Sequence, residues 1–158
     1  MSDDLKSLER WAGALLSKLE PSARRSINMQ VARDLRRSQQ QRIKAQLAPD
    51  ASPYTPRKNR KKLRDKQGRI KKKKAAMFTK ITQAKSFRVT ADQNQIGVGF
   101  FARVARIARV HQFGLKDKVS QNGPEVVYEK RQLLGLSDVE KEKVRDSMLK
   151  HLEQTRHL

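Results

Sequence analysis

The sequence contains no cysteine among its 158 residues, and aromatic residues make up only 5% of it. Without cysteine, the chain has no disulfide bond, no thiol nucleophile and no thiolate metal ligand. No apolar run exceeds four residues, so no segment is long enough to cross a bilayer as a helix. The first five residues, Met-Ser-Asp-Asp-Leu, are acidic rather than apolar, which is not typical of a secretory signal. We therefore expect a protein that is made in the cytosol and does not enter a membrane.

The sequence also lacks the residue patterns of enzyme active sites. Its seven glycines are scattered, and no phosphate-binding loop of the G-x-x-x-x-G-K type occurs. No pair of carboxylates indicates acid–base catalysis, and no spacing of His, Asp and Glu indicates a metal site. His111 is the one histidine outside the C-terminal tail, and no nucleophile or carboxylate partner is placed beside it by the sequence. We predict no catalytic residue, no cofactor and no metal, and a structural role for His111. An enzyme that uses His111 as a base is the alternative.

Positive charge dominates the residues that are present. There are 37 lysines and arginines against 16 aspartates and glutamates, which gives a formal net charge of +21. Charged residues make up 34% of the chain, above the roughly 25% that is typical of globular proteins. Such an excess indicates a polyanionic partner, either nucleic acid or an acidic protein surface.

The charge is concentrated between Arg57 and Lys74, where twelve basic residues and one acid supply +11 of the total. Too few apolar residues occur there to form a core, so residues 49–74 are predicted to form a basic arm, flexible or ordered by its partner. No aromatic residue interleaves with the basic ones and no base-reading motif is present, so any contact with DNA is expected to be independent of sequence. The residues expected to face the anionic partner are Arg57, Lys58, Arg60, Lys61, Lys62, Arg64, Lys71, Lys72, Lys73 and Lys74.

The N-terminal part is predicted to form two helices. Apolar residues from Leu5 to Leu19 recur on one face, which indicates an amphipathic helix over 2–19. A second apolar repeat predicts a longer helix over 22–48, opened by Pro21 and followed by a proline-rich loop.

The middle of the chain is predicted to form a hairpin and a helix. Alternating apolar residues indicate two strands, 87–91 and 96–100, with a polar turn between them. Apolar residues at every third position favour a helix over 101–113, which Gly114 is expected to end. Residues 115–124 are predicted to be a polar loop.

The C-terminal part is predicted to add a strand and a helix. Residues 126–128 indicate a third strand, and Ser137 with Glu140 three residues later forms a capping-box pattern that opens the last helix. Residues 1–158 are thus predicted to form a single α+β domain. It would comprise two N-terminal helices, a basic extended arm, a small antiparallel sheet with one packed helix, and a C-terminal helix.

The predicted helix over 101–113 carries a second candidate surface. Arg103, Arg106 and Arg109 are three residues apart, so they form a basic stripe that would also face the anionic partner. The residues at the end of this helix are expected to fix a buried helix end and the following loop: His111, Gln112, Phe113 and Gly114.

Short motifs in a fixed order carry a resemblance to a known family. After a leucine-rich first helix they are Pro21-Ser22-Ala23-Arg24-Arg25, Arg37-Ser38-Gln39-Gln40-Gln41-Arg42-Ile43, Pro53-Tyr54-Thr55-Pro56-Arg57-Lys58, Gly68-Arg69-Ile70 and Met77-Phe78-Thr79-Lys80-Ile81. The strongest is Ala108-Arg109-Val110-His111-Gln112-Phe113-Gly114, followed by Arg131-Gln132-Leu133-Leu134-Gly135-Leu136-Ser137. In order and spacing, over about residues 5–150, the chain resembles the phage virion morphogenesis family, the tail completion proteins of P2-like and Mu-like contractile-tailed phages.

The resemblance implies a non-enzymatic assembly protein that acts late, at the head-proximal end of the tail, so that a finished tail can join a DNA-filled head. It implies a virion protein of the tail or neck, assembled in the host bacterial cytoplasm. The implied partners are further copies in a homo-oligomeric ring, tail tube or sheath proteins, head connector proteins and, non-specifically, DNA in the lumen. Arg131 is expected to pin the last strand to its neighbour.

Two hypotheses of function remain open at this point. In the first, the chain is a structural protein of the phage neck or tail terminus, and a ring interface should survive deletion of residues 57–74. In the second, it is a sequence-independent nucleic-acid-binding protein, and that deletion should abolish binding and function together.

Overall fold

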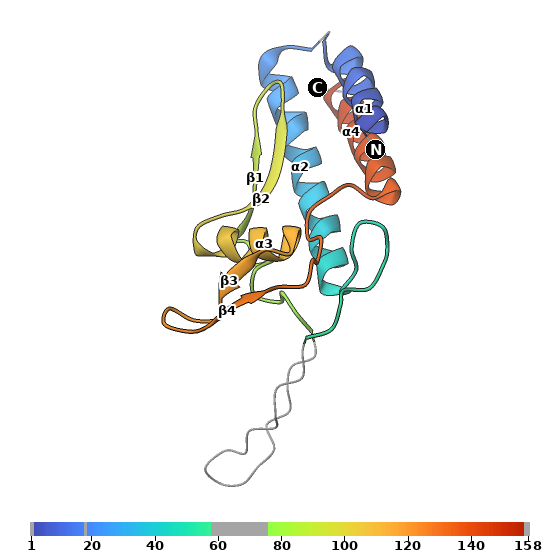
Figure 1. The fold of residues 1–158 in the computed structure, drawn as a ribbon. Helices are drawn as coiled ribbons and strands as arrows, with labels where there is room; N and C mark the ends of the chain where they lie inside the picture. Colours follow the sequence, from blue (N-terminus) through green and yellow to red (C-terminus); the bar gives the residue numbers. More distant parts are fainter. Residues whose placement is uncertain (1, 18, 58–75, 157–158) are drawn as a thin grey trace.

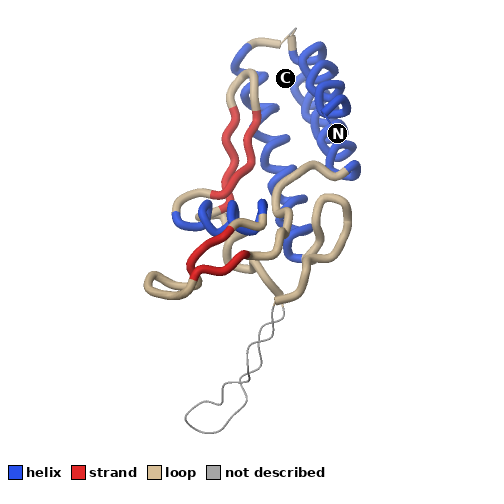
Figure 2. Tube along the Cα trace, in the orientation of Figure 1, coloured by secondary structure: helices blue, strands red, loops and turns tan. Residues whose placement is uncertain are grey.

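The computed structural model describes residues 2–17, 19–57 and 76–156. The elements follow in chain order as α1 (Ser2–Leu16), α2 (Pro21–Lys44), β1 (Phe87–Ala91), β2 (Ile96–Phe100), α3 (Arg103–Phe113), β3 (Lys116–Lys118), β4 (Glu125–Val127) and α4 (Asp138–Arg156). The long helix α2 runs through the middle, with the β1–β2 hairpin along one side and α1 and α4 along the other (Figure 1). Figure 2 shows the same separation of strands from the two terminal helices, and the predicted α+β fold is confirmed.

Apolar clusters form at both ends of α2. Near its start, Ile27 and Val31 pack against apolar residues of α1 and α4, namely Leu8, Leu16, Val144 and Met148. Near its end, Ile43 packs in a second cluster with Ala48, Tyr54, Met77, Phe78, Ile81, Ala108 and Leu133. The apolar residues of α2, which are separated by multiples of four residues, therefore form one stripe that packs against two different sets of neighbours. Between the clusters, the buried Gln39 amide donates a hydrogen bond to the Gly135 carbonyl at 3.2 Å.

The predicted hairpin over 87–91 and 96–100 is confirmed. Strands β1 and β2 pair antiparallel, with Phe87 opposite Phe100, and the two rings stack with centroids 4.8 Å apart. The Asp92 carboxylate closes the turn by accepting hydrogen bonds from the Asn94 and Gln95 backbone N–H groups at 2.7 and 2.9 Å. An aspartate that bonds to the backbone two residues ahead is a common way to stabilise such a turn.

A second hairpin replaces part of the predicted loop over 115–124. Strand β3 pairs antiparallel with β4, so that Asp117 lies opposite Val126, and this pair is a separate two-stranded sheet. The predicted third strand is therefore displaced by one residue and is not joined to β1–β2. The Lys-Asp-Lys sequence of β3 has no apolar alternation, because the strand lies at the surface, and periodicity gives no sign of it.

Both N-terminal helices end earlier than the apolar pattern predicts. Helix α1 ends at Leu16, and α2 ends at Lys44, just before Gln46 adopts a positive φ of 64°. The Gln46 side chain donates a hydrogen bond to the Met77 carbonyl at 2.9 Å and accepts one from the Met77 N–H at 2.7 Å. The end of α2 is thus fixed by a partner 31 residues away, which a local pattern cannot reveal.

The first residues of the predicted basic arm lie against the body of the protein. Tyr54 is buried, and its hydroxyl donates a hydrogen bond to the Gln132 carbonyl at 3.3 Å. Burial raises the pKa of the Tyr54 hydroxyl to about 12, so the group is a neutral donor at physiological pH. Residues 58–74 of the arm lie outside the described residues.

The predicted capping box opens α4. The Glu140 carboxylate accepts hydrogen bonds from the Ser137 N–H at 2.9 Å and the Ser137 hydroxyl at 3.1 Å. In return, the Glu140 N–H donates to the Ser137 hydroxyl oxygen at 3.1 Å. These reciprocal bonds satisfy backbone groups that have no partner within the helix.

Glu140 also forms an ion pair with Arg42 of α2. The two side chains approach to 3.2 Å, and they are only 3% and 10% exposed. The Arg42 guanidinium donates to three further oxygens, the carbonyls of Leu47, Leu133 and Gly135, at 3.2–3.3 Å. One arginine therefore joins the end of α2, the segment before α4 and the first turn of α4.

Replacing Glu140 by alanine is expected to lower the free energy of unfolding by about 3 kcal/mol or more, because it leaves the Arg42 charge buried without its counterion. Asp138→Ala removes a carboxylate from the same helix turn and is the matched control, since that side chain is 95% exposed. Denaturant unfolding followed by circular dichroism measures both variants. Equal effects of the two substitutions would contradict the assigned role of the buried pair.

Candidate interaction surfaces

A polar cluster of His111, Gln112 and Arg131 lies between α3 and the chain before α4. Arg131 is buried, and its guanidinium donates hydrogen bonds to the carbonyls of Thr55 at 2.7 Å and Pro56 at 3.2 Å. The Arg131 N–H also donates to the His111 carbonyl at 2.7 Å. Arg131 lies four residues after β4, so it joins the 55–56 loop to the end of α3 instead of pinning a strand to its neighbour.

Gln112 and Gly114 fix the end of α3. The Gln112 side-chain oxygen accepts hydrogen bonds from the N–H groups of Leu133 and Leu134 at 2.8 and 2.9 Å, and its amide donates to the Leu134 carbonyl at 2.9 Å. Gly114 adopts a left-handed conformation with φ of 67°, and a β-carbon there would lie 3.2 Å from atoms of Lys130. The prediction that the helix ends at Gly114 is confirmed, and both the angle and the close approach favour glycine.

His111 is held as a neutral ring by its neighbours. Its Nδ1 atom lies 3.3 Å from an Arg131 guanidinium nitrogen, which can only donate, so Nδ1 accepts. The ring also makes edge contacts with Phe78 and Tyr128, with centroids 4.9 and 5.2 Å apart. Burial, followed by the Arg131 charge, lowers the pKa of His111 below its usual 6.5. Among the described residues, no carboxylate or hydroxyl hydrogen-bonds to this ring.

The predicted basic stripe lies on the exposed surface of α3. All three of its arginines are exposed, and Arg106 forms an ion pair with Asp117 of β3. Phe113, which is expected in a buried helix end, is instead 62% exposed. It follows the last arginine of the stripe by four residues. Of the basic residues named for the arm, only Arg57 is described, and it is exposed. Lys58, Arg60, Lys61, Lys62, Arg64 and Lys71 to Lys74 lie outside the described residues.

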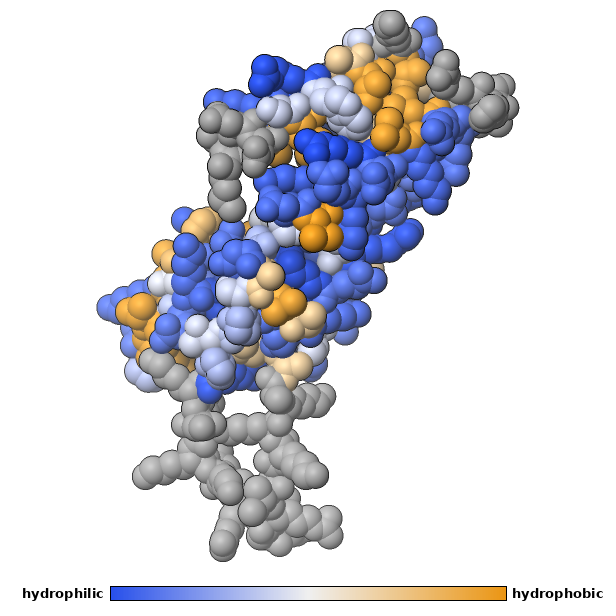
Figure 3. Space-filling model, turned by 90° about the vertical axis from the view of Figure 1, so that its right-hand side faces the viewer, coloured by the Kyte–Doolittle hydropathy of each residue, from blue (hydrophilic) through white to orange (hydrophobic). Residues whose placement is uncertain are grey.

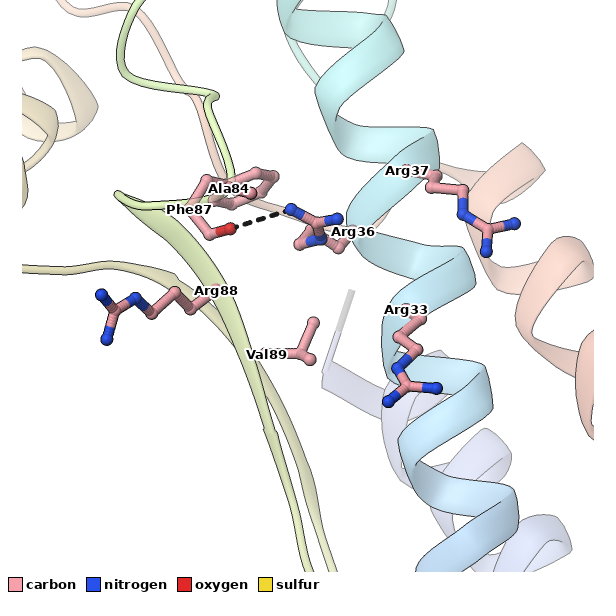
Figure 4. A pocket seen from close by; sticks show the side chains of 7 residues that line it. All are labelled: Arg33, Arg36, Arg37, Ala84, Phe87, Arg88 and Val89. Atoms are coloured by element: carbon pink, nitrogen blue, oxygen red, sulfur yellow. Dashed lines mark hydrogen bonds between the residues drawn. The ribbon is translucent and has the colours of Figure 1, made fainter.

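A cleft lined by arginines lies between α2 and β1, with a volume of about 360 Å³. Four arginines border it together with apolar residues of the strand side: Arg33, Arg36, Arg37, Arg88, Ala84, Phe87 and Val89. Arg36 reaches across to donate a hydrogen bond to the Phe87 carbonyl at 3.1 Å, while Arg37 and Arg88 point away from the cleft on either side (Figure 4). The sequence shows the spacing of the α2 arginines, but it does not reveal that Arg88 lies across from them.

Exposed apolar residues gather around α3 and the second hairpin. Of the ten large apolar residues that are exposed in the described part of the chain, seven lie between Phe101 and Val127. The most exposed are Val127 at 65% and Phe113 at 62%. The side that carries α1 and α4 shows its largest hydrophobic area at the upper end, with smaller ones in the middle and the lower part between hydrophilic residues (Figure 3). Clustered exposed apolar residues are typical of surfaces that bind other proteins.

The described residues contain no group of three or more His, Asp or Glu side chains placed to hold a metal ion. Each helix in the described ranges is too short or too polar to cross a bilayer.

Arg131→Met is expected to destabilise the fold by about 2–4 kcal/mol, because the Thr55 and Pro56 carbonyls lose their charged donor. Arg131→Lys keeps the charge without the forked geometry and should fall between the wild type and Arg131→Met. Lys130→Met, at the exposed neighbouring position, is the control. Thermal and denaturant unfolding measure the effect, and a loss no larger than that of the control would rule out the assigned role.

Stability is expected to fall with decreasing pH through His111. Since its pKa is lowered in the folded chain, the unfolded chain binds the proton more tightly, and protonation favours unfolding. This contribution is complete above pH 6.5 and is lost as the pH falls from there towards the lowered pKa. In His111→Gln, the corresponding slope of unfolding free energy against pH should disappear. An unchanged slope would contradict the neutral state of His111.

The chain matches known proteins over almost its whole length. The sequence model of the phage virion morphogenesis family matches residues 3–153. The tail completion protein S of Escherichia phage P2 is 35% identical over 153 residues, which cover 96% of this chain and 99% of that protein. No solved structure gives a significant match. The resemblance carried by the sequence motifs is thereby confirmed, and the chain belongs to the phage virion morphogenesis family.

Proposed function

We propose that the protein is a structural assembly protein of a phage tail, which completes the head-proximal end of the tail so that a head can join it. The observation that carries this proposal is the nearly end-to-end match with a tail completion protein. Because the match covers 96% of this chain, it includes both the core and the exposed surfaces rather than a shared fragment. The protein would be assembled in the host bacterial cytoplasm and remain in the tail or neck of the virion.

The geometry of the polar cluster supports a structural rather than an enzymatic role. His111 faces a buried guanidinium and two aromatic rings, and within the described ranges the Gln112 side chain bonds only to backbone groups of Leu133 and Leu134. A general base needs an open approach for the proton that it removes, and a neighbouring positive charge makes it a weaker base. We therefore assign His111, Gln112 and Arg131 to positioning α3, with the exposed surfaces as the functional parts.

The proposed partners follow from those surfaces. Exposed apolar residues around α3 suit contact with other proteins, namely further copies in a ring at the neck or tail terminus, tail tube or sheath proteins, or head connector proteins. The basic arm over 49–74 and the arginine cleft suit an anionic partner, either an acidic protein surface or DNA in the lumen. We propose a single domain over residues 1–158 that carries these surfaces together.

A second candidate function, sequence-independent nucleic-acid binding, is favoured by the net charge of +21. It predicts that the isolated protein binds DNA tightly at low salt, with a steep loss of affinity as salt rises. Under the tail-assembly proposal, removing residues 57–74 weakens DNA contact but leaves contacts between protein copies in place.

Electron microscopy of lysates from the producing strain, with and without the gene, tests the tail-assembly proposal. We expect the null lysate to contain separate DNA-filled heads and unjoined or abnormally long tails. Re-expression of the gene should restore joined particles, which controls for effects on neighbouring genes. Normal joined particles in the null lysate would refute the proposal and favour nucleic-acid binding.

A further inference from the structure

Helix α4 exposes a continuous stripe of acidic and apolar side chains. Its members are alternately three and four residues apart, so they share one face of the helix. This α4 seam consists of Val139, Glu142, Asp146, Leu149 and Glu153, and all five side chains are exposed. The opposite face of α4 packs Val144 and Met148 into the core. The seam is therefore an outer surface of the described structure, with Val139 64% and Leu149 44% exposed.

The acidic character of the α4 seam is unusual in so basic a chain. Glu142 forms an ion pair with Arg145 of the same helix, and Lys143 and Lys150 lie beside the seam. The carboxylates of Asp146 and Glu153 have no ion pair or hydrogen bond among the described residues. Two carboxylates without an ion pair, next to exposed apolar side chains, suit a surface that receives a basic and apolar partner.

Helix α3 presents the complementary surface. Its exposed residues, here the α3 face, are Arg103, Arg106, Ile107, Arg109 and Phe113. The α3 sequence contains no acidic residue, and Asp117 of β3 neutralises only Arg106. Arg103 and Arg109 have no ion pair among the described residues. Ile107 and Phe113 add two apolar residues that are 46% and 62% exposed. The two helices thus combine the same kinds of group with opposite charge.

The α3 face and the α4 seam cannot meet within one chain. Helix α3 lies on the β1–β2 side of α2, whereas α4 lies along the other side, next to α1 (Figure 1). Two complementary patches on opposite sides of one molecule can contact each other only between two molecules, in a head-to-tail arrangement. Such heterologous contacts close into a ring when the rotation between copies allows it.

We infer that the α3 face of one copy docks on the α4 seam of the next copy, and that this contact links subunits of the ring. The inference rests on the proposed function, because a ring at the tail end is part of that function. Arg103 and Arg109 would lie near Asp146 and Glu153 of the neighbouring copy, with Phe113 and Ile107 against Val139 and Leu149. The occupant of each surface is a second copy of this same chain.

A contact formed by one 11-residue helix is small. Stable interfaces bury about 800 Å² on each partner, and a short helix face with its flanking residues provides only part of that area. Each contact is therefore weak and sensitive to salt, since its charges lie at the surface. In a closed ring every copy makes two such contacts, and closure makes the assembly far more stable than a single pair.

Sedimentation velocity of the full chain, treated with nuclease and measured over a range of protein concentrations at low salt, tests the inference. The wild type should form species larger than a monomer that grow with concentration and dissociate as salt is added. Arg103→Glu with Arg109→Glu should weaken this association about tenfold, because two attractions become repulsions. Asp146→Lys with Glu153→Lys should weaken it to a similar degree.

The chain that carries all four substitutions is the decisive variant. Its α3 face is acidic and its α4 seam is basic, so association should return to within a few-fold of the wild type. Lys80→Glu with Lys85→Glu, exposed and away from both surfaces in the sequence, changes the net charge as the α3 substitutions do and should leave association unchanged. Circular dichroism confirms that each variant is folded.

Three results would overturn the inference: a wild type that stays monomeric throughout, reversed variants that associate like the wild type, or no recovery in the fourfold variant. If Arg103→Glu with Arg109→Glu loses DNA binding, and the fourfold variant does not recover association, the α3 arginines bind nucleic acid instead. Complementation of the null strain separates this inference from the proposed function. If the gene is required for joined particles but both reversed variants restore them fully, the interface is wrong and the tail-assembly function stands.

Discussion

Arg42 and Glu140 form the contact on which the arrangement of the helices depends. Arg42 is near the C-terminal end of α2, and Glu140 is in the first turn of α4, 98 residues further along the chain. The same guanidinium binds the carbonyls of Leu47, Leu133 and Gly135, so it also fixes the chain on both sides. A buried pair gives little net stability relative to apolar residues, but it is costly to leave one partner alone. The contact therefore selects one position of α4 along α2.

From that position the remaining surfaces follow. With α4 held against α2, Val144 and Met148 enter the core and the opposite face of α4 is left outside. Leu133 is held by the same arginine and accompanies Ile43 in the second cluster, while Gln112 binds the Leu133 and Leu134 N–H groups and draws the end of α3 to this segment. The contacts of His111, Gln112 and Arg131 thus join α3 to the neighbouring segments and leave its charged face outward.

The sequence predicts well those features whose partners are close in the chain. Ser137 and Glu140 are three residues apart, and the capping box is visible as a motif; Gly114 ends α3 for a reason that a single residue type conveys. Features that depend on distant partners are not visible. Arg42 reads as one of many surface arginines and Gln46 as an ordinary helical residue, because their partners lie 98 and 31 residues away. The sequence does not predict strand β3, because its three residues, Lys-Asp-Lys, are all charged and show no apolar alternation.

The candidate surfaces also differ in whether the sequence alone reveals them. The basic stripe of Arg103, Arg106 and Arg109 can be read from spacing, since helical neighbours three apart share a face. The arginine cleft and the exposed position of Phe113 require the fold, because each depends on which element lies opposite. Neither the residue spacing nor the fold indicates the process in which these surfaces act. Membership of the phage virion morphogenesis family indicates that process.

Electron cryomicroscopy of joined particles and isolated tails from the producing strain tests the central claim most directly. The account predicts density for this fold at the head-proximal end of the tail, repeated around the tail axis, with α3 of each copy against α4 of its neighbour. Density at the distal end or along the tube would contradict the assigned place in the tail. A ring at the correct end with other helices at the contacts would leave the assembly role intact and contradict the proposed interface.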